Sequence, residues 1–147
     1  MRLLPPTTND AYTGSPLAAG FLALVGLLTI VPGCIHTFLA DGGAGVIAGL
    51  DLSQNGALVV ALFAWAGATQ IAFGLALLLV ALRYRPLVPA MLALVLLERA
   101  LHALNGWVLK GGSGHHPPEH YAVLVALPLV ACALTMSLRG QRASLRR

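Results

Sequence analysis

The segment from Met91 to Trp107, MLALVLLERALHALNGW, places an acid, a guanidinium and an imidazole inside a run that is otherwise lipid-soluble. A charge at the centre of a bilayer costs about 2.5–3.5 kcal/mol on insertion scales, so such residues usually face protein or a water-filled cavity. Glu98, Arg99 and His102 therefore mark the centre of a candidate site.

The rest of the chain is equally hydrophobic. Its 147 residues are 58% hydrophobic and 10% charged, and the mean hydropathy is +0.83. About 20 apolar residues are needed for each spanning helix, so the length allows four crossings and leaves no room for a separate soluble domain. We predict an all-α, polytopic membrane protein built as one four-helix bundle.

The order of apolar and polar segments sets the boundaries. We expect a loose polar lead-in over residues 1–16 and a frayed basic tail over residues 139–147. The predicted transmembrane domain, 17–138, has spans at about 17–39, 57–82, 87–109 and 121–138. A glycine-rich loop joins the first two spans, with a short surface helix over Val46–Leu52 as one alternative.

Basic residues predict the orientation. With four spans, both termini and the turn between the second and third spans share one side. That side collects Arg2, Arg83, Arg85, Arg139, Arg142, Arg146 and Arg147, whereas the other side has only Lys110. Short cytoplasmic loops retain lysine and arginine, so we expect both termini in the cytoplasm of a bacterium, with the chain in its inner membrane. The same placement accounts for the net charge of +4 without a nucleic-acid partner.

A polar stripe is predicted along the third span. Glu98, His102 and Asn105 follow the spacing i, i+4, i+7 and so share one helix face. Gln70 lies near the centre of the second span, at a depth that matches Glu98. Two glycines flank it on one narrow face, which favours tight helix contact together with an interhelical hydrogen bond from the amide.

Arg99 points about a quarter-turn away from this stripe. Neighbours on a helix do not face one another, so we predict a partner other than Glu98 of the same chain. The candidates are a lipid or cofactor anion, Glu98 of a second subunit, Gln70, Thr29, and the carbonyls freed by Pro32 and Pro128. One interpretation is that Glu98 and Arg99 form a network that only holds the helices together. The other is that they bind a ligand or carry protons, since buried ionic groups are costly to retain.

The first span ends in Pro32-Gly33-x-x-His36. Proline removes an amide donor and favours a kink, and glycine permits close approach of a second backbone. His36 would line an opening at the kink or simply bond a nearby carbonyl.

Metal and haem sites are weaker alternatives. Glu98 and His102 could bind a metal together with His36 or loop imidazoles, and His36 with His102 could hold haem. Three loop histidines could bind zinc or copper on the outer surface, or be ordinary surface residues: His115, His116 and His120.

The two cysteines lie in different spans, and we expect no disulfide between them.

Several of these features resemble the DoxX-like group of small bacterial membrane proteins. They are the four short spans with both ends inside, Pro32-Gly33-x-x-His36, Gly67-x-x-Gln70-x-x-x-Gly74 and Glu98-Arg99-x-x-His102. The resemblance covers Leu17 to Leu138. It implies a tie to membrane redox chemistry or quinones, and it assigns no catalytic residue.

Our leading hypothesis is a self-associating binding or accessory protein whose cavity opens outward between the first three helices and holds a lipophile such as a quinone. Glu98 would exchange a proton, and the remaining ligand contacts would come from Gln70, Arg99, His102, Asn105 and His36. The first alternative is an enzyme that isomerises or oxidises a lipid-like substrate, with Glu98 and His102 as an acid–base pair. The second is a proton-coupled or metal transporter that works as a dimer.

Overall fold

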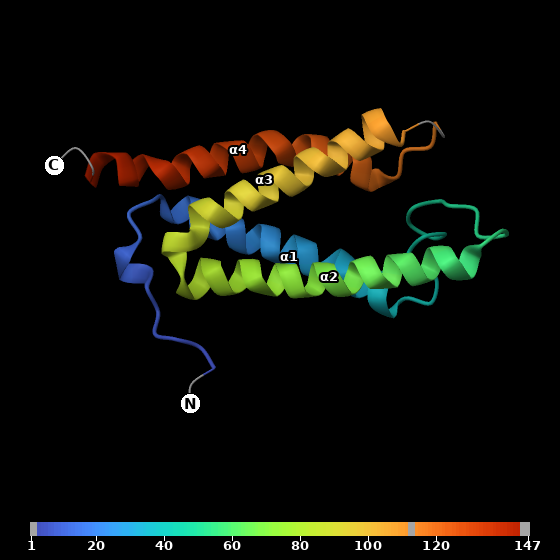
Figure 1. Ribbon diagram of the computed structural model, residues 1–147, viewed down its shortest axis with the longest axis horizontal. Helices are drawn as coiled ribbons and strands as arrows, with labels where there is room; N and C mark the ends of the chain where they lie inside the picture. The colour runs from blue at the N-terminus through green and yellow to red at the C-terminus, as the bar shows by residue number, and fades with distance from the viewer. Residues whose placement is uncertain (1–2, 112–113, 145–147) are drawn as a thin grey trace.

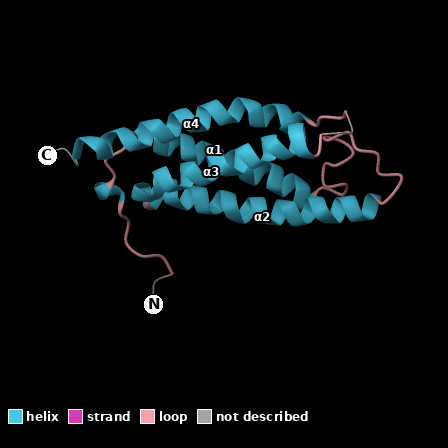
Figure 2. Ribbon diagram, turned by 45° about the horizontal axis from the view of Figure 1, so that its top comes forward, coloured by secondary structure: helices cyan, strands magenta, loops and turns pink. Residues whose placement is uncertain are grey.

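The fold is all-helical. The computed structural model describes residues 3–111 and 114–144, with side chains described as far as Arg139. Its long helices are α1 (Pro16–Phe38), α2 (Gly56–Arg83), α3 (Val88–Leu104) and α4 (Pro118–Ser144). Shorter elements are the 3₁₀ turns η1 (Asn9–Ala11) and η2 (Arg85–Leu87) and the π-helical turn η3 (Asn105–Leu109). No strand occurs in the described ranges, as Figure 2 shows.

Four segments are long and apolar enough to cross a membrane: Pro16–Phe38, Gly56–Arg83, Arg85–Leu109 and Pro118–Arg139. The four spans predicted from hydropathy are therefore confirmed as helices of sufficient length. Many large apolar side chains on these helices are exposed in the single chain, for example Leu27, Val31, Leu62 and Leu94. An apolar exterior of this kind is what a lipid-facing bundle requires.

The helices pair as two hairpins that meet at one end. The most extensive packing joins α1 to α2, followed by α3 to α4, and few contacts join α2 to α3. In Figure 1 the two hairpins lie close together near η2 and diverge toward the end that carries the loops 39–55 and 110–117. We call the first the turn end and the second the loop end.

Small residues set the distance between α1 and α2. A Cβ atom at Gly67 would lie 2.7 Å from the Gly33 carbonyl oxygen, and one at Gly74 would lie 2.7 Å from that of Gly26. These separations are shorter than van der Waals contact, so only glycine allows this backbone approach. The tight contact predicted for the Gly67–Gly74 face is confirmed, and α1 runs unbroken through Pro32.

The apolar core is concentrated at the turn end. Each long helix contributes buried residues from the half nearest that end, among them Leu22, Leu77, Leu92 and Ala133. At the loop end the hairpins diverge and the core gives way to polar side chains. This distribution leaves space for a site in the loop half of the bundle.

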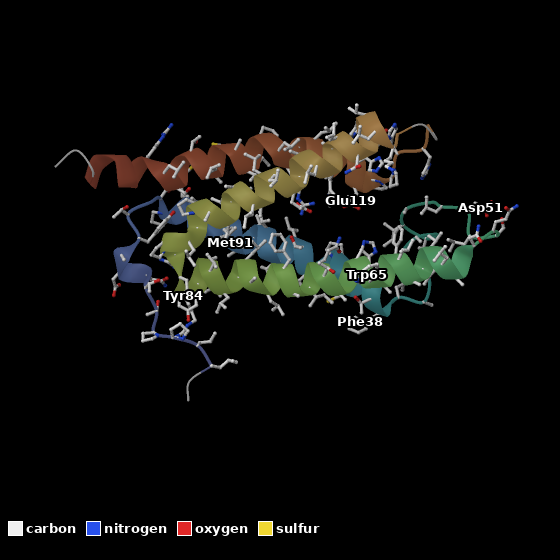
Figure 3. All side chains as sticks on the ribbon, in the orientation of Figure 1. Phe38, Asp51, Trp65, Tyr84, Met91 and Glu119 are labelled. Carbon is white, nitrogen blue, oxygen red and sulfur yellow. The ribbon has the colours of Figure 1, made fainter. Side chains whose placement is uncertain are left out.

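The lead-in is not loose as predicted, because it bonds to the end of α2. The Thr7 hydroxyl and the Thr8 amide both donate to the Arg83 carbonyl, and the Asn9 side chain donates to the Leu82 carbonyl at 2.7 Å. Helices end with unpaired carbonyls, and these donors satisfy two of them. Figure 3 shows Tyr84 beside this lead-in, where its hydroxyl donates to the carbonyl of Pro5.

Two other local predictions are corrected. Instead of frayed backbone, residues 139–144 of the predicted tail continue α4 to Ser144, and residues 145–147 lie outside the described part of the chain. Residues 46–52 form no surface helix; the loop consists of turns over 40–48 followed by irregular backbone over 49–52. The Asp41 carboxylate explains the second difference, since it accepts hydrogen bonds from the amides of Gly43, Gly45 and Val46 and so stabilises turns in place of a helix.

Candidate functional site

A cavity of about 430 Å³ lies between the two hairpins in the loop half of the bundle. Its polar lining includes Gln70 of α2, the adjacent Glu98 and Arg99 of α3, and His36 of α1. Apolar side chains such as Leu28, Ile35 and Phe63 complete the walls. The prediction placed a cavity between the first three helices; the first turn of α4 also contributes, through Pro118, Glu119 and His120.

Gln70 has an unpaired oxygen in this cavity. Its Oε1 atom is buried and has no hydrogen-bond partner among the described residues. The structure shows no interhelical hydrogen bond to this oxygen, although one was predicted for the amide, and the side chain lines the cavity. A buried unpaired acceptor costs about 1–3 kcal/mol, which marks Gln70 as a position that a ligand donor would satisfy.

Glu98 is the centre of an ionic cluster. Its Oε2 lies 3.1 Å from Arg99 Nε, and its Oε1 lies 3.2 Å from His102 Nδ1. The prediction that Arg99 needs a partner other than its neighbour Glu98 is wrong, because the long guanidinium side chain bends back to the adjacent carboxylate. The Oε2 contact lacks hydrogen-bonding geometry, so this buried oxygen retains acceptor capacity toward the cavity.

His36 combines the two roles considered for it. Its Nδ1 lies 2.7 Å from the Gly42 carbonyl, and its ring packs edge-on against Phe63 with ring centroids 5.0 Å apart. A carbonyl only accepts, so Nδ1 carries the proton and donates it. The bond fixes the ring orientation while the side chain lines the cavity.

Two other predicted residues lie outside this cavity. His102 and Asn105 line a second pocket of about 350 Å³ nearer the end of α3, together with Lys110, Glu119 and His120. The Asn105 side-chain amide donates to the Leu101 carbonyl at 2.9 Å and so caps its own helix. The predicted polar stripe is therefore divided between two pockets.

The loop histidines do not assemble into a three-ligand metal site. His115 Nε2 donates to the Ala48 carbonyl, 2.7 Å away, which joins the two loops. His116 stacks on Trp107, and its Nδ1 lies 3.1 Å from Nδ1 of His120. Across residues 3–111 and 114–139, no group of three or more histidine, cysteine, aspartate or glutamate side chains is placed to hold a metal ion.

Sequence reasoning missed two contributors to the cavity wall. Glu119, which the sequence analysis does not single out, lies in the first turn of α4 and lines both pockets. Figure 3 shows it at the loop end, between the two hairpins. The other contributor is Phe63, whose ring packs against His36. A carboxylate beside a proline pair was the available signal for Glu119, whereas Phe63 gave none.

Comparisons of the chain with protein-family models, with curated proteins and with solved structures find no match.

Proposed function

We propose that this protein is an integral membrane protein that binds a small lipophilic molecule with a polar head, such as a quinone, in the cavity between its hairpins. The observation that carries the proposal is the buried, unpaired oxygen of Gln70 in a cavity shared with the Glu98–Arg99 pair. Both groups line the same cavity, whose other walls combine apolar side chains with His36, Glu119 and His120.

The cavity suits such a molecule in size and chemistry. Its volume of about 430 Å³ falls in the range of roughly 300–1,000 Å³ typical of small-molecule sites. A ligand hydroxyl would donate to Gln70 Oε1 or Glu98 Oε2, and a ligand carbonyl would accept from the Arg99 guanidinium. Leu28, Pro32 and Phe63 would pack against a ring or an alkyl chain.

The proposed setting is the inner membrane of a bacterium. The arginine distribution supports both termini in the cytoplasm, and the loop end would then face outward. A relationship to the DoxX-like group and self-association in the membrane complete the proposal. The relationship rests on the sequence patterns described above.

Ligand extraction and a matched pair of variants test the proposal. The full chain is purified in mild detergent, its organic extract is analysed by mass spectrometry, and decylubiquinone is titrated while tryptophan fluorescence is recorded. Gln70→Leu removes the unpaired acceptor, and we expect it to weaken binding about tenfold or more, the value of one hydrogen bond of about 1.4 kcal/mol. Thr69→Ala is the control, because Thr69 is exposed and bonds only to the Trp65 carbonyl of its own helix.

Absence of any co-purifying lipophile, combined with equal decylubiquinone affinity in Gln70→Leu and Thr69→Ala, would refute the proposal. Loss of affinity in both variants to the same extent would also count against it, since Thr69 does not reach the cavity.

An enzyme remains the second candidate, and the Glu98–His102 contact of 3.2 Å favours it. A carboxylate and an imidazole at this distance can share a proton during acid–base catalysis. Turnover of a quinone or lipid substrate, with a pH profile that changes in Glu98→Gln, would distinguish an enzyme from a binding protein.

A purely structural pair makes a different prediction. If Glu98 and Arg99 only hold the helices together, replacing both with leucine should be tolerated, whereas Arg99→Leu alone leaves a carboxylate without its cation. We expect the single variant to unfold at lower temperature than the double variant in either case. Only a ligand-binding role predicts that the double variant also loses decylubiquinone binding.

A further inference from the structure

The two pockets share one polar wall. Glu98 lines the inner cavity, and His102 lines the pocket nearer the loop end. Glu119 and His120 line both. A group on this wall can therefore contact the inner cavity on one side and the outer pocket on the other.

The ionisable side chains on this wall form a continuous series. His102 Nδ1 lies 3.2 Å from Glu98 Oε1 and 3.9 Å from Glu119 Oε1. Side-chain exposure rises along the series, from 33% for Glu98 to 46% for His102 and 53% for Glu119. The imidazole thus stands between an inner carboxylate and a more exposed one.

We propose that Glu98, His102 and Glu119 form a proton path that connects the inner cavity to the loop side of the protein. This deepens the proposed function, on which it rests, because it specifies the ligand class. The cavity would take molecules whose hydroxyl or carboxyl group gains or loses a proton there, as a quinol does.

Each step transfers one proton between named atoms. A ligand hydroxyl gives its proton to Glu98, and the protonated Glu98 then passes one to Nδ1 of neutral His102. The imidazolium gives its Nδ1 proton to ionised Glu119 through one bridging water or after a side-chain rotation, because 3.9 Å is too long for a direct hydrogen bond. Glu119 then releases the proton to water in the outer pocket. Nδ1 must be unprotonated to accept, so His102 starts with its proton on Nε2.

Other charged and titratable groups surround the path. Arg99 lies beside Glu98 on α3, and His36 approaches the same cavity from α1. Lys110 and His120 line the outer pocket with His102. His120 is held by His116 through the contact between their Nδ1 atoms, which leaves His102 as the imidazole placed between the two carboxylates.

The side from which Glu98 receives protons can be tested without any ligand. Membrane vesicles of one orientation, prepared from cells that express the full chain, are set to different internal and external pH values. Dicyclohexylcarbodiimide, a lipophilic reagent that modifies protonated carboxyl groups, is added, and labelling of Glu98 is followed by mass spectrometry. We expect labelling of Glu98 to rise about tenfold as the pH on the loop side falls from neutral to acid. Labelling should not change with the pH on the turn side.

A kinetic measurement isolates His102. After a rapid fall in pH, the infrared carbonyl band of protonated Glu98, assigned with Glu98→Gln, reports how quickly the carboxylate takes up a proton. We expect His102→Gln and Glu119→Gln to slow this uptake about tenfold or more. Asp51→Asn is the matched control, because it removes an exposed carboxylate on the same side of the protein.

Labelling that follows the pH of the turn side, a Glu98 that is never labelled, or an unchanged uptake rate in His102→Gln would overturn the path. Since no ligand is used, these outcomes leave the decylubiquinone titration of the wild type intact. Conversely, a wild type that binds no lipophile but shows sided, His102-dependent uptake would refute the proposed function and retain the path.

Discussion

Asp41 holds the loop that covers the outer end of the cavity. Hydrogen bonds from the backbone amides of Val46 and Gly43, followed by that of Gly45, keep the pKa of its carboxyl below the usual range. A depressed pKa contributes stability above the unfolded-state value of about 3.9 and loses it as the pH falls through the lower folded value. Gly43 and Ile47 of this loop line the cavity, so protonation of Asp41 should loosen that wall.

Asp41→Asn tests this role. The neutral amide presents one acceptor oxygen where the carboxylate presents two, so we expect faster hydrogen exchange at Gly43, Gly45 and Val46 at neutral pH. In the wild type the protection factors of the same amides, which correct for the intrinsic pH dependence of exchange, should fall only under acid conditions. Hydrogen–deuterium exchange measured by mass spectrometry provides both results, with Asp10→Asn as control; equal exchange in all three proteins would contradict the assignment.

The identities of the residues were enough to predict most of the site. The contacts that their side chains make could not be predicted. Glu98, Arg99 and Gln70 stand out because they are polar within apolar helices, and all three line one cavity. Their partners could not be predicted, because helix spacing describes where Cβ atoms point and not how far a long side chain bends. This is why Arg99 reaches its neighbour and Asn105 turns back to its own helix.

The distance between α1 and α2 is fixed by glycines at their contact, and substitution of these glycines should destabilise the hairpin. A methyl group at Gly67 would meet the Gly33 carbonyl at 2.7 Å, whereas one at Gly20, also within a helix, would meet nothing within 4 Å. Overpacking costs about 1–3 kcal/mol, and alanine regains about 1 kcal/mol of helix propensity. We therefore expect Gly67→Ala to be destabilising and Gly20→Ala to be neutral or stabilising.

Thermal unfolding of the purified variants in one detergent measures the difference. A melting temperature for Gly67→Ala equal to or above that of Gly20→Ala would show that the hairpin can widen without loss. Decylubiquinone affinity should fall with Gly67→Ala as well, because Gln70 lies one turn further along the same face and moves with it.

Among the secondary-structure elements, those determined by apolar composition alone were predicted best from the sequence. Four apolar segments are helices because lipid-soluble runs of this length satisfy their backbone only in that form. Prediction failed where a single side chain redirects the backbone. Asp41 converts residues 40–48 into turns, and the lead-in is fixed by donors such as Asn9 that find carbonyls at the end of α2.

The turn end and the loop end of the molecule differ in composition, and this difference is visible only when all four helices are considered together. The turn end combines the apolar core with the arginines of the Arg83–Arg85 turn, and the loop end combines the cavity with histidines and acids. The cavity itself could not be predicted in detail, since it depends on how far the hairpins diverge. The divergence accompanies close glycine packing within the α1–α2 hairpin and few contacts between α2 and α3.

The orientation of the chain in the membrane determines which side of the membrane the cavity and its ionisable side chains face. If the arginine-rich turn end faces the cytoplasm, a fluorescent protein fused after Arg147 should fluoresce, and alkaline phosphatase inserted after Gln54 should be active outside the inner membrane. The reciprocal fusions, phosphatase at the C-terminus and fluorescent protein after Gln54, are the controls and should be silent. The opposite pattern would turn the loop end toward the cytoplasm, and the path from Glu98 through His102 to Glu119 would then exchange protons with the cell interior.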